Sequence, residues 1–145
     1  MCIRDSSILA LVSIVDGALD LLISGMSLQK ILGYIFAPIC WLLGVPWSEA
    51  PSAAELLGLK LATNEFVAYI QLGGLEPEFF SDRTKVILLY ALCGFANFSS
   101  VGILISGIGA MAPERTGDLI DVSVKALVGA TLASCLTGLV AGLFV

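Results

Sequence analysis

One carboxylate stands alone in an otherwise uncharged part of the sequence. No other charged residue than Glu65 occurs between Lys60 and Glu76. A second polar island, residues 93–100, follows in another uncharged run and contains Asn97. An ionisable residue or an unpaired amide is costly in a bilayer and usually faces a bundle interior or an aqueous cavity, where it handles ions or solutes. The two islands therefore indicate a solute site.

The overall composition indicates that these islands lie in a membrane protein. The 145 residues are 58% hydrophobic and 13% charged, with a mean hydropathy of +1.00. A soluble domain is about 45–50% apolar and about 25% charged. A chain of this length cannot bury that excess in one core, so we expect a lipid bilayer as its setting. The net charge of −5 argues against nucleic acid as a partner.

The residue types also exclude several kinds of chemistry. The sequence has no histidine, which excludes a Cys/His zinc site and a Ser-His-Asp triad. It offers no nucleophile–base pair, metal cluster or phosphate loop, so we expect neither an enzyme nor a resident cofactor or metal. The four cysteines, Cys2, Cys40, Cys93 and Cys135, are far apart. We interpret them as small hydrophobic residues.

Five segments are expected, all of them helical. They are a transmembrane helix at 7–25, an interfacial helix at 27–45, a re-entrant hairpin at 51–73, a broken transmembrane helix at 84–110 and a transmembrane helix at 118–145. Residues 1–6 look like an abrupt beginning in mid-protein, and we interpret them as non-native sequence. Asp16 and Asp20 share one face of the first segment. They could face water or belong to a poorly behaved first segment, and an aspartyl protease is disfavoured because such sites place the carboxylates on different helices.

The middle segments are assigned from their interruptions. Each half of 51–73 has about ten residues, too few to cross about 30 Å of hydrocarbon at about 1.5 Å per residue. Gly94 and the polar residues after it interrupt 84–110, and such broken backbone is tolerated at depth only where it lines a cavity or is covered by protein. Pro38 is expected to break or kink 27–45, and Trp41 and Trp47 indicate the membrane–water interface.

The last segment carries a small residue at every fourth position. These residues are Ala126, Ala130, Ser134, Gly138 and Gly142. Such a stripe lies on one helix face and allows a neighbouring helix to approach closely. We interpret it as a packing surface.

Two long motifs make a family resemblance specific. The string GLKLATNEFVAY at 58–69 closely resembles the signature of the concentrative nucleoside transporter family, and YALCGFANFSS at 90–100 resembles its second strong motif. GYIFAP at 33–38 and APER at 112–115 fit as well. The resemblance covers about residues 25–145 and corresponds to the C-terminal half of the family.

The resemblance implies an all-α polytopic membrane protein, half of an inverted-repeat elevator-type transporter. Family members are homotrimeric symporters that use a sodium or proton gradient to import nucleosides, so a bacterial inner membrane is the expected location. The resemblance places Glu65, Asn97 and Ser100 on the ribose hydroxyls and Phe95 on the pocket wall. Thr63 and Asn64 would support the hairpin tip. Nucleobase recognition and the main ion site are expected in the family's other half.

Other interpretations of these residues remain open. Glu65 could form a structural ion pair with Lys60 or Lys125, Asn97 could cap a half-helix, and Ser99 could satisfy freed backbone groups. The whole chain could instead be a non-transporting membrane scaffold or interaction fragment. That alternative predicts that Glu65→Gln changes nothing but stability.

Overall fold

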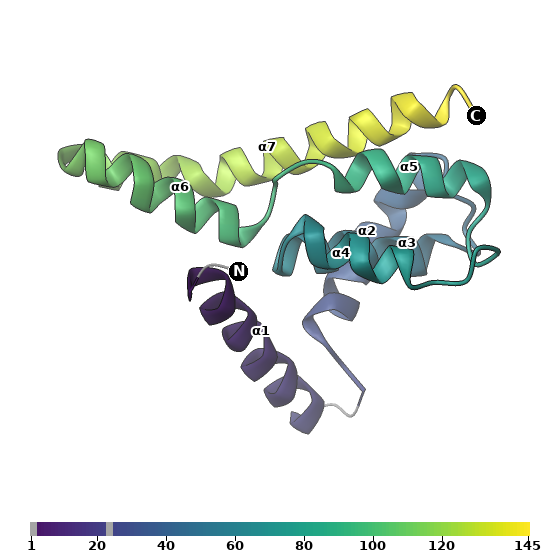
Figure 1. Ribbon diagram of the computed structural model, residues 1–145, viewed down its shortest axis with the longest axis horizontal. Helices are drawn as coiled ribbons and strands as arrows, with labels where there is room; N and C mark the ends of the chain where they lie inside the picture. Colours follow the sequence, from purple (N-terminus) through teal and green to yellow (C-terminus); the bar gives the residue numbers. More distant parts are fainter. Residues whose placement is uncertain (1–2, 23–24) are drawn as a thin grey trace.

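The computed structural model describes residues 3–22 and 25–145. In those two ranges, every element of regular secondary structure is a helix (Figure 1). Their order is α1 (Ile3–Leu22), α2 (Leu28–Leu42), α3 (Ala50–Ala62), α4 (Glu65–Gly73), α5 (Asp82–Leu92), α6 (Phe98–Met111), the short 3-10 helix η1 (Pro113–Arg115) and α7 (Thr116–Gly142). Helices α2 to α5 pack together, and α7 runs first beside α6 and then past α5 (Figure 1). Residues 1 and 2, part of the segment interpreted as non-native, lie outside the described residues.

The turn between α1 and α2 is held by the two aspartates of α1. Asp16 Oδ1 accepts a hydrogen bond from the Leu28 N–H at 2.7 Å, and Asp20 Oδ1 accepts one from the Gly25 N–H at 2.7 Å. Gly25 has a φ of +82°, a left-handed conformation that glycine adopts without steric cost. Lys30 Nζ donates to the Gly25 carbonyl at 2.7 Å. The two carboxylates therefore connect α1 to α2.

Helices α2 and α3 form the most closely packed pair. A Cβ atom placed on Gly58 would lie 2.9 Å from Leu32 Cβ and 3.0 Å from the Gln29 carbonyl oxygen. The first motif thus places glycine where two helix backbones nearly touch. Helix α2 does not end at Pro38 but continues to Leu42, so the predicted break is absent. A proline can lie inside a helix when tertiary packing offsets the lost hydrogen bond.

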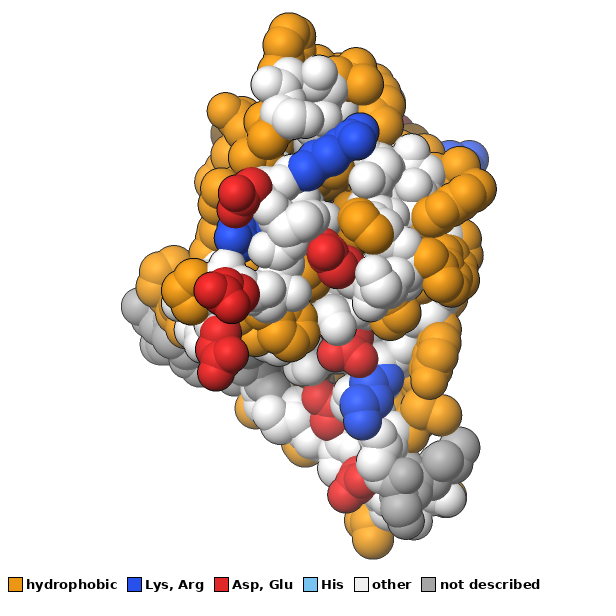
Figure 2. Space-filling view, turned by 90° about the vertical axis from the view of Figure 1, so that its right-hand side faces the viewer, with side chains coloured by type: hydrophobic (Ala, Val, Ile, Leu, Met, Phe, Trp, Pro, Cys, Tyr) orange, Lys and Arg blue, Asp and Glu red, His pale blue; other side chains and the backbone are white. Residues whose placement is uncertain are grey.

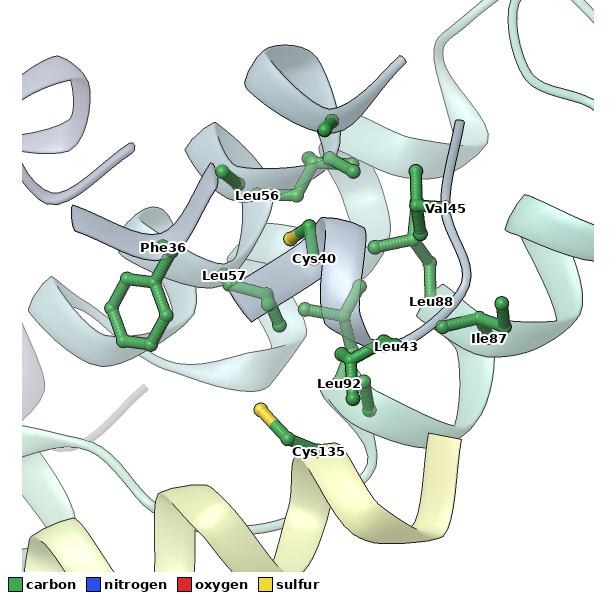
Figure 3. Packing of buried hydrophobic residues seen from close by; sticks show 14 of the residues in the cluster. Phe36, Cys40, Leu43, Val45, Leu56, Leu57, Ile87, Leu88, Leu92 and Cys135 are labelled. Carbon is green, nitrogen blue, oxygen red and sulfur yellow. The ribbon is translucent and has the colours of Figure 1, made fainter. Parts of the chain in front are cut away.

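The core fills the space between α2, α3, α5 and α7 (Figure 3). Its members include Phe36, Leu43, Val45, Leu56, Leu57, Ile87, Leu88 and Leu92. Cys40 and Cys135 are buried within it as free thiols, which confirms their interpretation as small hydrophobic residues. Cys93 is exposed, and Cys2 lies outside the described residues.

The small-residue stripe of α7 packs against α5 along its C-terminal part. A Cβ atom placed on Gly138 would lie 2.6 Å from the Ile87 carbonyl oxygen and 2.9 Å from Ala91 Cβ. Gly142 faces the Ile87 side chain, and Ser134 is buried beside them. The predicted close helix approach is confirmed here.

Length and composition single out one stretch as able to cross a membrane. Within the described residues, only Pro113–Gly142 is long and apolar enough to do so. At about 1.5 Å per residue, α7 alone is about 40 Å long. Its large exposed apolar side chains include Val122, Val124, Val128, Leu132, Leu136 and Val140. On the face that Figure 2 shows, acidic and basic side chains form a strip with apolar side chains on both sides of it.

Candidate functional site

The hairpin tip is a helix break whose free backbone groups are bonded by side chains. Helix α3 ends at Ala62, and Thr63 Oγ1 donates to the Leu59 carbonyl at 2.7 Å. Helix α4 begins directly after Asn64, whose Oδ1 accepts from the Val67 N–H at 2.9 Å. Asparagine thus satisfies an amide that the break leaves without an intrahelical partner, and the Thr63 hydroxyl adds a second hydrogen bond to the Leu59 carbonyl, which also accepts the Thr63 N–H at 2.9 Å. Glu65 becomes the first residue of α4 as a result.

The second break uses the same device. Helix α5 ends at Leu92, residues 93–97 form an irregular connection, and α6 begins after Asn97. Asn97 Oδ1 accepts from the Ser100 N–H at 2.7 Å, which makes Asn97 the N-cap of α6. The capping role left open for Asn97 is therefore real.

The two breaks meet through one hydrogen bond. Asn97 Nδ2 donates to Glu65 Oε2 at 2.9 Å. The Asn97 side chain is only 1% exposed, whereas Glu65 is half-buried. The bond holds one carboxylate oxygen and orients the group. The first residue of one half-helix is therefore fixed against the cap of another half-helix.

The alternative partners of Glu65 lie elsewhere. Among residues 3–22 and 25–145, the ion pairs are Lys85–Asp82 and Arg115–Asp118, so neither Lys60 nor Lys125 pairs with Glu65. Lys125 is exposed on α7. The structural ion-pair interpretation of Glu65 is not supported by this geometry.

Lys60 takes a position that the sequence reasoning missed. It is only 2% exposed, and its Nζ donates to the Ala91 carbonyl at 2.9 Å. Tyr69 donates through its hydroxyl to the neighbouring Leu89 carbonyl at 2.6 Å. Both carbonyls belong to the last turn of α5, where the helix supplies no partner. A signal was present in the sequence, because Lys60 is the one charged residue between Glu55 and Glu65.

The remaining predicted site residues border an apolar cavity between α6 and α7. Its volume is about 220 Å³, and its walls include Phe95, Ser100, Leu104, Leu119, Ala126 and Ala130. Phe95 is 74% exposed, and the side chain of Ser100 is part of the wall next to it. Ser99 is buried on α6. Glu65, Asn97, Ser100 and Phe95 therefore lie around the two helix breaks.

Comparison with known proteins identifies the family. The family model described as "Na+ dependent nucleoside transporter C-terminus" matches residues 6–142. The chain belongs to the concentrative nucleoside transporter family. The match begins within α1, so membership extends further toward the N-terminus than the motifs alone indicated. Transporters of this family are not enzymes, in agreement with the residue-type analysis.

Individual relatives agree with this assignment. The chain is 43% identical over 124 residues to the nucleoside permease NupC of Helicobacter pylori, covering 83% of this chain and 30% of that protein. It is 44% identical over 141 residues to the uncharacterized transporter YutK of Bacillus subtilis, covering 94% of this chain and 35% of that protein. It is 38% identical over 154 residues to human sodium/nucleoside cotransporter 1, covering 93% of this chain and 24% of that protein. The chain thus spans about a quarter to a third of the length of these relatives.

Solved structures share the fold. A structure of CNTnw in an inward-facing substrate-bound state superposes with a TM-score of 0.84 at 41% identity, covering 97% of this chain and 35% of that one. A CNTnw variant in an intermediate state gives a TM-score of 0.91 at 39% identity, covering 98% of this chain and 37% of that one. The helix arrangement of this chain is therefore that of the corresponding third of a nucleoside transporter.

Proposed function

We propose that this chain forms the ribose-binding side of the substrate pocket in a cation-coupled nucleoside symporter. The 2.9 Å hydrogen bond from Asn97 Nδ2 to Glu65 Oε2 carries the proposal, because it joins the two helix breaks at one polar point in an apolar protein. Ribose hydroxyls both donate and accept hydrogen bonds. A carboxylate accepts, an amide does both and the Ser100 hydroxyl adapts, so the three side chains match a sugar edge.

The wider architecture in the proposal is half of an inverted-repeat elevator-type transporter. The α3–α4 pair is the re-entrant hairpin, and α5 with α6 is the broken helix. At about 1.5 Å per residue, none of these four helices reaches the about 30 Å of a hydrocarbon core, which supports the assignment. The proposal includes a homotrimer, an inner-membrane location and sodium or proton coupling, as the family resemblance implies. The name of the human relative, sodium/nucleoside cotransporter 1, supports cation coupling.

The experiment is uridine uptake by the full-length transporter that carries this sequence, with and without a sodium gradient. Glu65→Gln keeps the size of the side chain but removes its charge, and we expect uptake to be lost at equal membrane level. Glu76→Gln is the matched control, because it makes the same change at an exposed residue of the loop after the hairpin. Uptake should be unchanged in that variant.

Nucleosides that lack one ribose hydroxyl sharpen the test. A site built on hydrogen bonds to a hydroxyl rejects an analogue without it, because its own polar groups are then left unpaired. The wild type should therefore discriminate uridine from 2′-deoxyuridine and 3′-deoxyuridine. If Glu65→Gln transports uridine normally and discriminates as the wild type does, the pocket assignment is wrong and the scaffold alternative stands. The 145 residues alone, placed in vesicles, should not take up nucleosides.

A further inference from the structure

The carbonyl end of α5 is closed by a lysine. Lys60 belongs to the last turn of α3, and its Nζ lies 2.9 Å from the Ala91 carbonyl oxygen, in the last turn of α5. The last four carbonyls of a helix have no intrahelical partner and carry about half a negative charge between them. A positive charge at this point is therefore favourable, and with 2% exposure the lysine head has almost no access to bulk water.

The surroundings of the lysine link it to the candidate site. A Cβ atom placed on Gly94, in the break itself, would lie 3.6 Å from Lys60 Nζ. Glu65 begins the next helix, α4, five residues after Lys60. The lysine thus contacts the end of α5 and lies next to the break that leads to Asn97, and the ion pairs of the described residues do not include one between it and Glu65.

The ammonium group of Lys60 occupies the kind of position that a bound cation has in other transporters. In transporters with broken helices, unwound carbonyls and the C-terminal ends of half-helices coordinate the coupling cation. An ammonium group at hydrogen-bonding distance from the carbonyl of such an end offers the same charge, fixed to the protein. We infer that Lys60 is a built-in cation: its ammonium group binds the carbonyl end of α5 where a mobile monovalent cation would otherwise bind. By fixing that end, Lys60 positions Asn97 against Glu65. This inference rests on the proposed function.

The positioning follows from the path of the chain. Lys60 fixes where α5 ends, and residues 93–97 connect that end to α6, whose cap is Asn97. A neutral side chain at residue 60 would leave the carbonyl end without its charge and loosen the contact of Asn97 with Glu65. A sodium ion could then enter and restore the arrangement, so nucleoside affinity would acquire a new dependence on sodium.

The test is the KM for uridine in the full-length transporter, measured over a range of sodium concentrations with choline holding ionic strength constant. Lys60→Gln keeps an N–H donor but not the charge. We expect its KM to be at least 10-fold above that of the wild type at low sodium and to return toward the wild type at high sodium. Lys60→Met should show the same raised KM and the same return at high sodium as Lys60→Gln. Lys60→Arg keeps the charge, so its KM should depend on sodium as that of the wild type does.

Tyr69→Phe is the matched control. It removes the uncharged hydrogen bond to the neighbouring Leu89 carbonyl at the same helix end, and its KM should stay within 3-fold of the wild type. An equal rise in Tyr69→Phe would assign the effect to hydrogen bonding and overturn the inference. A wild-type KM in Lys60→Gln, or a raised KM that sodium does not lower, would do the same.

Membrane levels and Glu65→Gln separate the other outcomes. If both neutral variants are missing from the membrane while Lys60→Arg is present, the charge serves folding and the inference is overturned. Normal uptake in Glu65→Gln would overturn the proposed function itself. If uptake is lost in Glu65→Gln but the KM of Lys60→Gln equals that of the wild type, only the inference that Lys60 acts as a built-in cation is overturned.

Discussion

Replacing Asn97 by serine in the full-length transporter separates the two hydrogen bonds that this side chain makes. Serine is as good an N-cap as asparagine, so the Ser100 N–H keeps its acceptor and α6 keeps its first turn. The serine side chain is too short to reach Glu65 as the asparagine amide does. Glu65 therefore loses the donor that lies 2.9 Å from its Oε2 atom.

The magnitude follows from the kind of bond that is lost. A hydrogen bond to a charged group contributes about 1.5–3 kcal/mol. Since about 1.4 kcal/mol corresponds to a factor of ten, the KM for uridine should rise about 10- to 150-fold. Asn97→Ala should raise KM by a similar factor and should lower the free energy of unfolding by about 1 kcal/mol more than Asn97→Ser does, because the cap is lost as well.

The assay combines initial rates of uridine uptake with thermal unfolding of the purified transporter in detergent. Asn64→Ser is the matched control, since Asn64 caps α4 in the same way through the Val67 N–H. Its KM should stay within about 3-fold of the wild type, because serine preserves that cap. A wild-type KM in Asn97→Ser, or an equal rise in Asn64→Ser, would refute a role for the Asn97–Glu65 bond in binding.

Three further changes test the packing and the pocket. Gly138→Val should lower the free energy of unfolding by about 1–3 kcal/mol because the added atoms meet the backbone of α5. Gly129→Val should have little effect, because nothing lies within 4 Å of its added Cβ. Thermal unfolding of both variants measures the difference. Gly44→Ala should cost about 1–2 kcal/mol because φ is +94° there, and denaturant unfolding should show Gly73→Ala to be neutral or stabilising. Phe95→Ala should raise the KM for uridine about tenfold through lost aromatic contact worth about 1.5 kcal/mol, as uptake kinetics would show.

Local patterns in the sequence were sufficient to predict the two helix breaks. Thr63, Asn64 and Asn97 are residue types that hydrogen-bond free backbone groups, so their place in apolar runs indicated where helices stop and start. The stripe through Gly138 likewise indicated a close helix approach, because its four-residue spacing is a property of one helix. Pro38 was expected to break or kink its helix, and only the structure shows that α2 continues through it to Leu42.

Sequence alone determined the apolar composition, the family and the residue types of the candidate site. Only the tertiary structure decided their partners: Glu65 could have met a lysine, but it accepts from Asn97, and Lys60 instead closes the end of α5. Asp16 and Asp20 likewise proved to hold the turn after α1. The physical reason is that helix caps depend on neighbours within a few residues, whereas these other contacts join segments that only the packing of helices brings together.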